Sequence, residues 1–326
     1  MQHVQEERLM DKNRKILVSL FAFVLLSLLL SLFQIYFTMD RRGGKSSVFS
    51  SVETSPGVGI VRITGPITMT GDGGSFGGPA TGGADAIVAE LDDLAADPMV
   101  KAIVVRIDSP GGTVAATQEI FAKLMKIRRS DKKPIVASMG DIAASGGYYT
   151  ASACDHIMAN QGTITASIGV IASAPNLKGL FEKLGIKMNV IKSGKYKDIL
   201  STSREMTADE QALLQTMIDT AYAQFLKDVS LGRNIPIDDI RPVADGRVMN
   251  GDAALASHLI DSLGTFEDAI DKAKELAKLP SDAPVYDEDR DPVQALLSAF
   301  GMSVRNAVPH DIVSRVTPLV EYRYLP

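Results

Sequence analysis

The longest run of apolar residues lies near the start of the chain. Residues 16–39 read ILVSLFAFVLLSLLLSLFQIYFTM and contain no charged side chain. A helix of this length, with a rise of ~1.5 Å per residue, spans the ~30 Å hydrocarbon core of a bilayer with some tilt. A cleaved signal peptide has a shorter apolar run and a small-residue exit, whereas this run ends in YFTMDRR. The pattern therefore predicts one retained transmembrane helix over 16–39, and no later segment is apolar enough to span again.

Polar residues on both sides of this run define the remaining segments. Four basic residues precede it and three follow, which barely favours a cytoplasmic N-terminus: Arg8, Lys12, Arg14 and Lys15 before it, and Arg41, Arg42 and Lys45 after it. Glycine and serine after the run are typical of a linker. We divide the chain into an N-terminal segment 1–15, a transmembrane helix 16–39, a linker 40–57, a folded domain 58–279 and a tail 280–326 without a predicted role.

Within the folded domain, short β-branched runs alternate with segments of helical periodicity. Strands are predicted over 58–67, 101–108, 134–139, 156–160, 162–171 and 187–193. Helices are predicted over 84–97, 115–129, 147–154, 176–186, 207–233, 252–264 and 265–279, with a further apolar helix over 293–304 in the tail. The helix over 207–233 begins with a capping box of Thr207 and Glu210. This alternation predicts an α/β fold with a largely parallel sheet.

Composition adds few constraints. The 326 residues are 45% hydrophobic and 22% charged, as in a globular protein with a real core. A net charge of −5 offers no electrostatic case for nucleic acid. The single cysteine, Cys154, excludes an intrachain disulfide and a multi-cysteine zinc site, and its apolar surroundings predict a buried side chain. The glycine-rich segment 70–83 lacks the Gly-Lys-Ser/Thr ending of a phosphate-binding loop and is interpreted as a surface loop.

Candidate catalytic residues lie where two predicted strands end. One strand runs into SPGG at 109–112, and the next runs into GDIAASGGYY, which carries Ser145. In parallel sheets catalytic groups collect beyond the carboxyl ends of strands. The second turn is like a nucleophile elbow, although Ala143 takes the place of its first glycine. The backbone N–H groups of Gly146 and of the SPGG glycines could form an oxyanion hole, while a purely structural turn is the alternative.

A nucleophilic serine needs a base, and no histidine suggests itself. None of the four lies in a loop like that of Ser145: His3, His156, His258 and His310. The segment 193–207 offers Lys195 and Lys197 instead. A lysine acts as a base only when it has lost its proton, which burial away from carboxylates favours. Asp198 counts against Lys197 unless its side chain points away.

Four motifs in order carry a family resemblance. DSPGGTV, GDIAASGGYYTASACDHIMA, GTITASIGVI and SGKYKDIL together resemble the signal peptide peptidase A family of serine peptidases, over about 58–276. The resemblance implies the spiral α/β fold shared by the Clp protease subunit and crotonase. It further implies that Ser145 is the nucleophile, Lys197 the general base and Ser167 the residue that orients the base, with Gly112 and Gly146 as oxyanion donors.

The same resemblance implies substrates, location and assembly. Substrates would be signal peptides left in the membrane and other hydrophobic peptides, with no metal or organic cofactor. The lipid anchor would be 16–39, with a cytoplasmic N-terminus and an extracytoplasmic peptidase domain. A chain with one such unit is similar to the short form, a dome-shaped octameric ring in which Lys197 of one protomer meets Ser145 of its neighbour. The alternatives are a crotonase-type acyl-CoA enzyme and a non-catalytic membrane scaffold of the same fold.

Overall fold

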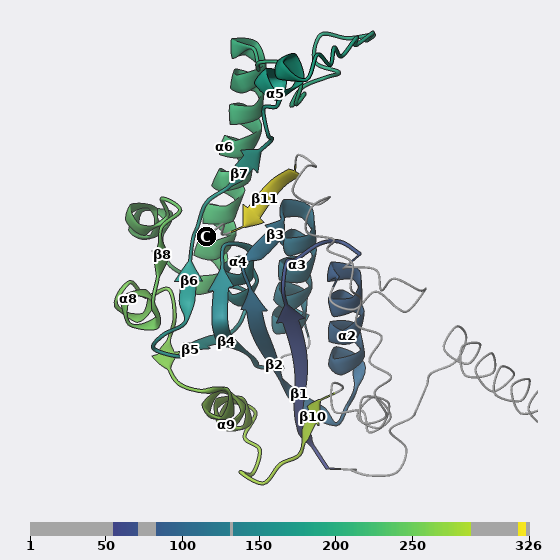
Figure 1. Ribbon diagram of the computed structural model, residues 1–326. Coiled ribbons are helices and arrows are strands. Elements are labelled where there is room, and N and C mark those ends of the chain that lie inside the picture. The colour runs from purple at the N-terminus through teal and green to yellow at the C-terminus, as the bar shows by residue number, and fades with distance from the viewer. Residues whose placement is uncertain (1–54, 71–82, 131–132, 288–318, 324–326) are drawn as a thin grey trace, which may run out of the picture. The chain divides into compact units, whose positions relative to one another are not determined.

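The computed structural model describes residues 55–70, 83–130, 133–287 and 319–323 (Figure 1). They belong to one compact unit, Thr54–Pro326. The helices predicted over 16–39 and 293–304 lie outside these ranges. Among the helices that are described, none combines the length and the apolar character that a bilayer span requires.

A mainly parallel sheet forms the centre of this unit. Its strands follow the order β10-β1-β2-β4-β5-β9, with β6 paired to β4 and β8 paired to β6. Every pairing is parallel except that of β6 with β8. The bounds are β1 Gly57–Thr64, β2 Val100–Ser109, β4 Ile135–Ala144, β5 His156–Ala159, β6 Ile164–Ala166, β8 Val248–Met249, β9 Ser262–Leu263 and β10 Val285–Asp287. The predicted parallel-rich α/β fold is confirmed.

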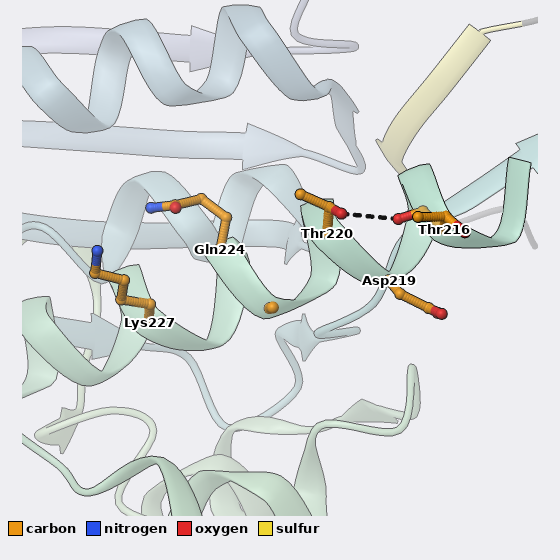
Figure 2. Close-up of a pocket in the computed structure, with 6 residues that line it drawn as sticks. Thr216, Asp219, Thr220, Gln224 and Lys227 are labelled. Atoms are coloured by element: carbon orange, nitrogen blue, oxygen red, sulfur yellow. Dashed lines mark hydrogen bonds between the residues drawn. The ribbon is translucent and has the colours of Figure 1, made fainter. Parts of the chain in front are cut away.

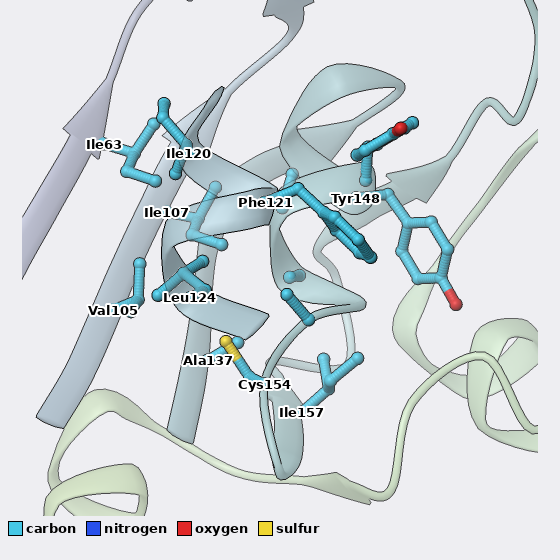
Figure 3. Packing of buried hydrophobic residues seen from close by; sticks show 14 of the residues in the cluster. Ile63, Val105, Ile107, Ile120, Phe121, Leu124, Ala137, Tyr148, Cys154 and Ile157 are labelled. Atoms are coloured by element: carbon cyan, nitrogen blue, oxygen red, sulfur yellow. The ribbon is translucent and has the colours of Figure 1, made fainter. Parts of the chain in front are cut away.

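Helices bury both faces of this sheet. Helices α2 (Ala84–Ala96) and α3 (Val114–Ser130) cover one face, and α9 (Phe266–Leu276) covers the other (Figure 1). Successive strand residues point to opposite faces. In β2, Val105 belongs to the same buried cluster as Leu124 of α3 (Figure 3), whereas Val104 belongs to the cluster that contains Ala273 of α9. Burial on both faces explains why the central strands are continuous apolar runs.

A second, smaller sheet lies beside the first. It contains β3 (Gly111–Thr113), β11 (Leu319–Arg323) and β7 (Ile171–Ser173), with β11 antiparallel to both neighbours. Both β11 and β10 come from the segment beyond residue 279, to which the sequence assigned no role. These strands contain only five and three residues, too few for a periodic pattern to reveal them.

The remaining helices include a long one that projects from the sheet. These are α4 (Gly146–Ala151), α5 (Lys178–Lys183), α6 (Ala208–Arg233), α7 (Ile237–Ile240), a 3-10 turn (Arg241–Val243) and α8 (Gly251–Ala256). The capping box of Thr207 and Glu210 at the start of α6 is confirmed. Phe225 and Val229 in the C-terminal half of α6 are buried, while its N-terminal half extends past the sheet toward α5 (Figure 1).

The strand predicted over 187–193 is wrong. These residues pair with no described strand, and the segment between α5 and α6 is almost wholly exposed. Val190 is 51% exposed and Ile191 is fully exposed. A β-branched run predicts a strand only where a sheet or core is present to receive it, and the described residues of one copy provide neither. We call residues 176–207 together with the exposed N-terminal half of α6 (208–220) the arm.

Candidate active site

The carboxyl ends of three parallel strands meet at the predicted site. Ser109 at the end of β2 is in register with Ala143 of β4, and Ala144 at the end of β4 is in register with Ala166 of β6. This alignment brings the turn 109–112 and the turn at Ser145 to one edge of the sheet. The convergence expected from the sequence is therefore present.

Ser145 occupies a strained turn between β4 and α4. Its backbone has φ 54° and ψ −113°, and its N–H donates to the carbonyl of Ala166 at 2.8 Å. Ala166 and Ser167 also have positive φ values, of 64° and 53°. Non-glycine residues rarely adopt this region, and such strain tends to cluster at functional sites. The hydrogen bond from Ser145 to Ala166 thus links three residues with strained backbones. One of them, Ser145, is the nucleophile predicted from the sequence.

Small residues surround Ser145 because two backbone segments touch there. A Cβ atom on Gly146 would lie 3.1 Å from the amide nitrogen of Gly112, and one on Gly147 would lie 2.7 Å from the carbonyl oxygen of Ser109. The approach at Gly147 is closer than real Cβ atoms show, and the one at Gly146 is tighter than nearly all of them. The contact brings Gly112 and Gly146, the two expected oxyanion donors, side by side next to Ser145.

Gly112 is the most tightly enclosed of these glycines. A Cβ atom there would lie 1.9 Å from the carbonyl oxygen of Ile67. We expect Gly112→Ala to displace the turn, to destabilise the fold by about 1–3 kcal/mol and to reduce any activity that depends on this backbone. Gly162→Ala is the matched control, because Gly162 is exposed and a Cβ atom there would have no heavy atom within 4 Å. Thermal unfolding and activity are measured for both, and a Gly112→Ala protein that behaves like the control contradicts this geometry.

Two buried tyrosines support the turn at Ser145. Tyr148 and Tyr149 follow the glycines and are fully buried. The Tyr148 hydroxyl donates to the carbonyl of Leu259 at 2.9 Å, and the Tyr149 hydroxyl donates to the carboxylate of Asp228 on α6. Burial raises the pKa of Tyr148 well above its usual value. These residues are therefore structural supports of α4.

Lys197 lies at the outer end of the arm. Its side chain is exposed, and within the described ranges its ammonium group has no hydrogen bond or ion pair. Its neighbours tie this segment to the first turn of α6, since Lys195 pairs with Asp209 and Arg204 pairs with Glu210. The hydrogen bond to Asp209 raises the pKa of Lys195, which favours its charged form.

A single copy of the chain does not bring Ser145 and Lys197 together. The ring of Phe225 in α6 packs on Tyr149, four residues after Ser145, with centroids 4.7 Å apart. Asp209 lies sixteen residues earlier in the same helix, about 24 Å along its axis at ~1.5 Å per residue. That separation exceeds the reach of a lysine side chain. The Ser145 hydroxyl accordingly has no hydrogen-bond partner among the described residues.

Ser167 lies beside the serine rather than beside the lysine. It follows β6, its N–H donates to the carbonyl of Arg247 at 2.8 Å, and its side chain is nearly buried. Ala166, the residue before it, accepts the N–H of Ser145. Ser167 is therefore placed to orient a lysine only if that lysine enters the site from elsewhere.

His156 does not reach this site. His156 is in register with Val136, eight residues before Ala144, which is roughly 26 Å along β4. Its ring bonds to the hydroxyl of Ser262 at 2.8 Å, and burial lowers its pKa.

Cys154 is fully buried in the core (Figure 3), as expected, and burial raises the pKa of its thiol. His258 follows α8, and His3 and His310 lie outside the described residues. Within the described ranges no group of His, Cys, Asp and Glu side chains could hold a metal ion.

A hollow on the surface of α6 contains none of the candidate residues. It is lined along one side of the helix (Figure 2) by Thr216, Asp219, Thr220, Ala223, Gln224 and Lys227. The Thr220 hydroxyl donates to the carbonyl of Thr216 at 2.8 Å. This hollow is a feature of an exposed helix surface and carries no chemistry of its own.

The chain is similar in sequence to a peptidase family and to named proteases. The model of peptidase family S49 matches residues 127–280, which include Ser145, Ser167 and Lys197. A putative protease of Synechocystis sp. is 52% identical over 191 residues, which cover 59% of this chain and 68% of that protein.

Two further relatives carry more specific names. A putative signal peptide peptidase of Enterococcus faecium is 37% identical over 202 residues, covering 62% of this chain and 58% of that protein. Protease 4 of Salmonella typhi is 34% identical over 244 residues, covering 74% of this chain and 39% of that protein. The similarity thus spans between about two fifths and two thirds of these relatives' lengths.

Proposed function

Because this chain belongs to peptidase family S49, we propose that it is a membrane-anchored serine endopeptidase with Ser145 as nucleophile and Lys197 as general base. The observation that carries the proposal is the strained turn at Ser145, packed against Gly112 at the carboxyl ends of parallel strands. A turn that served only as a connection would not need a strained serine and two glycines against a second backbone. Family membership favours this proposal over an acyl-CoA enzyme or an inactive scaffold.

The geometry supports an acyl-transfer mechanism. The neutral amine of Lys197, oriented by Ser167, takes the proton of the Ser145 hydroxyl, and the oxygen attacks a peptide carbonyl. The backbone N–H groups of Gly112 and Gly146 stabilise the resulting oxyanion. The lysine ammonium then protonates the leaving amine, and water hydrolyses the acyl-enzyme. This cycle needs no metal or organic cofactor.

Lys197 of one protomer would meet Ser145 of a neighbour. The separation of the two residues within one copy supports this, and so does the apolar surface of the arm. Ten large hydrophobic side chains are exposed there: Leu180, Leu184, Ile186, Met188, Val190, Ile191, Tyr196, Met206, Leu213 and Met217. Exposed apolar surface of this extent marks an interaction site. Head-to-tail contacts of this kind close into a ring, which we propose to be the dome-shaped octamer.

The proposed substrates are signal peptides left in the membrane and other hydrophobic peptides. The apolar run over 16–39 would anchor the chain in the same bilayer and hold the site near such peptides. The N-terminus would be cytoplasmic and the peptidase domain extracytoplasmic. The similarity to a putative signal peptide peptidase supports this substrate class.

Digestion of defined signal peptides by the full chain in detergent tests the proposal. Mass spectrometry of the products gives the cleaved bonds, and a fluorophosphonate probe reports a reactive serine. Labelling that is lost in Ser145→Ala supports the serine mechanism. Binding of acyl-CoA without peptide cleavage would support the crotonase-type alternative, and neither labelling nor cleavage would support a scaffold.

We expect activity to rise with pH to an optimum above neutrality. A lysine base accepts a proton only as the neutral amine, and ordinary lysines lose their proton near ~10.4. Glu210 does not obscure this rise, because the hydrogen bond from Arg204 lowers the pKa of its carboxyl group to about 2. The stabilisation from that pair is complete above the pKa of an unfolded glutamate, about 4.3, and is lost only as pH falls toward 2.

The measurement is kcat/KM against a fluorogenic peptide between about pH 5 and pH 10. Circular dichroism at each pH shows whether the fold persists. A profile that is already flat from about pH 5 to 9 would be incompatible with a lysine base.

A further inference from the structure

Carboxylates adjoin the segment that carries the proposed base, which raises a physical difficulty. Asp198 directly follows Lys197, and Asp209 and Glu210 lie in the first turn of α6, to which this segment is tied. A carboxylate close to a lysine stabilises the protonated ammonium form. A free Asp198 would therefore oppose the loss of the proton on which the proposed mechanism depends.

Arg204 holds the Asp198 carboxylate by both oxygens. Its Nε donates to Oδ2 at 2.9 Å and its Nη2 donates to Oδ1 at 2.9 Å. Nη2 also donates to the backbone carbonyl of Asp198 at 3.1 Å, and Lys192 Nζ donates to Oδ1 at 2.5 Å. The hydrogen bonds from Arg204, together with those from Lys192, keep the pKa of Asp198 far below its usual value. The planar guanidinium fork suits such two-point contacts, which an ammonium group cannot make.

The other edge of the same guanidinium binds the start of α6. Nη1 donates to Glu210 Oε2 at 2.8 Å, and Nη2 donates to Oε1 at 2.5 Å. Glu210 also accepts the backbone N–H of Thr207 in the capping box. Arg204 therefore ties the turn that carries Lys197 to the N-terminus of α6, and donates to both oxygens of both carboxylates.

Two further carboxylates near the Lys197 segment, those of Asp209 and Glu205, have partners of their own. Asp209 pairs with Lys195, and Glu205 accepts a hydrogen bond from Asn176 Nδ2 at 2.9 Å. Within the described ranges three charged residues of α5 make no ion pair with this segment: Lys178, Glu182 and Lys183. Unlike those of Lys192, Lys195 and Arg204, the side chain of Lys197 has no hydrogen bond or ion pair within the described ranges.

We propose that Arg204 is a positioning residue for the general base: it binds the Asp198 carboxylate and so keeps it from stabilising the ammonium form of Lys197, which allows the amine to become neutral. The inference rests on the proposed role of Lys197. Arg204 touches no reacting atom and acts through Asp198 alone. A residue with this role changes the pH at which the enzyme gains activity, whereas a merely structural residue changes activity equally at every pH.

The test compares pH profiles of kcat/KM for full-length variants in detergent. In Arg204→Gln, Asp198 keeps its contact with Lys192 but its Oδ2 is free to stabilise the lysine ammonium, and we expect the rising limb to move upward by about one pH unit or more. At a fixed pH on that limb, activity then falls about tenfold. The double variant Arg204→Gln with Asp198→Asn removes the freed carboxylate, and we expect its limb to return to the wild-type position.

Two single variants complete the design. In Asp198→Asn alone the rising limb should stay at the wild-type pH, because this variant has no carboxylate at position 198 to stabilise the lysine ammonium. Lys272→Gln is the matched control, since it removes one positive charge and an exposed ion pair with Glu275 on α9, and should leave the profile unchanged.

Several outcomes overturn the inference. One is an Arg204→Gln profile that falls equally at all pH values and is not restored by Asp198→Asn. If Arg204→Gln does not assemble, Arg204→Lys keeps the charge but loses the fork. A smaller upward shift that Asp198→Asn abolishes then supports the inference, and no shift overturns it. Lys197→Ala is assayed in parallel: if it is active, the proposed function fails, and if it is inactive while the limb of Arg204→Gln stays in place, only this inference fails.

Discussion

Ser145→Ala and Lys197→Ala are each expected to reduce peptidase activity by about 10⁴-fold or more while the chain keeps its fold. The first variant removes the attacking oxygen. The second removes the group that takes its proton, and His156 lies too far from Ser145 to replace it. Neither change opens a cavity in the core, because alanine is close in size to serine and Lys197 is exposed. Cleavage of a defined peptide gives the activity, and circular dichroism and thermal unfolding report the fold.

Lys195→Ala is the matched control for the lysine. Lys195 lies two residues away in the same exposed segment, but it pairs with Asp209, which favours its charged form. We expect this variant to lose only a small part of the activity. An inactive Lys195→Ala beside an active Lys197→Ala would show that the base has been assigned to the wrong residue.

Mixing two inactive proteins is expected to restore activity. In rings that contain both Ser145→Ala and Lys197→Ala protomers, some interfaces pair an intact serine of one protomer with an intact lysine of the other. The expectation follows from the position of the arm, because about 24 Å of α6 separates the lysine segment from the serine turn of the same chain. Subunits are exchanged in detergent, and peptide cleavage is followed over time.

Two controls make this result decisive. Differently tagged protomers that co-purify show that mixed rings have formed. Mixing Ser145→Ala with the double variant that lacks both residues provides no intact serine, and should remain inactive. If mixed rings form and the first mixture also stays inactive, the site is not shared between protomers, and the serine and lysine must act within one chain.

Local structure followed from the sequence where an element's own residues decide it. The continuous apolar runs of β2 and β4 identify strands buried on both faces, and the capping box of Thr207 and Glu210 identifies the start of α6. Ser145 could be selected because small residues after a predicted strand indicate a close backbone approach. The structure supplies the partner of that approach, the turn that contains Gly112.

Prediction from the sequence failed where a strand depends on a neighbouring element for pairing or burial. The β-branched run over 187–193 has the composition of a strand, but the described part of one copy gives it neither a pairing edge nor a core beneath it. Strands β10 and β11 show the reverse case, since their few residues carry little pattern and acquire a strand conformation by pairing with β1 and with β3 and β7. Strand formation is decided by partners as much as by composition.

Sequence alone determined the residue types of the site, and tertiary structure decided how they are arranged. The resemblance to the peptidase family predicts Ser145 as nucleophile, Ser167 as the residue that orients the base and Lys197 as the base, whereas the residues alone left Lys195 and Lys197 open. Only the folded chain shows that the first two adjoin while the third lies at the far end of a projecting helix, and that Asp198 is bound by Arg204. These relations join residues distant along the chain or depend on side-chain direction, which hydrophobic periodicity does not encode, since it reports only which face of an element is buried.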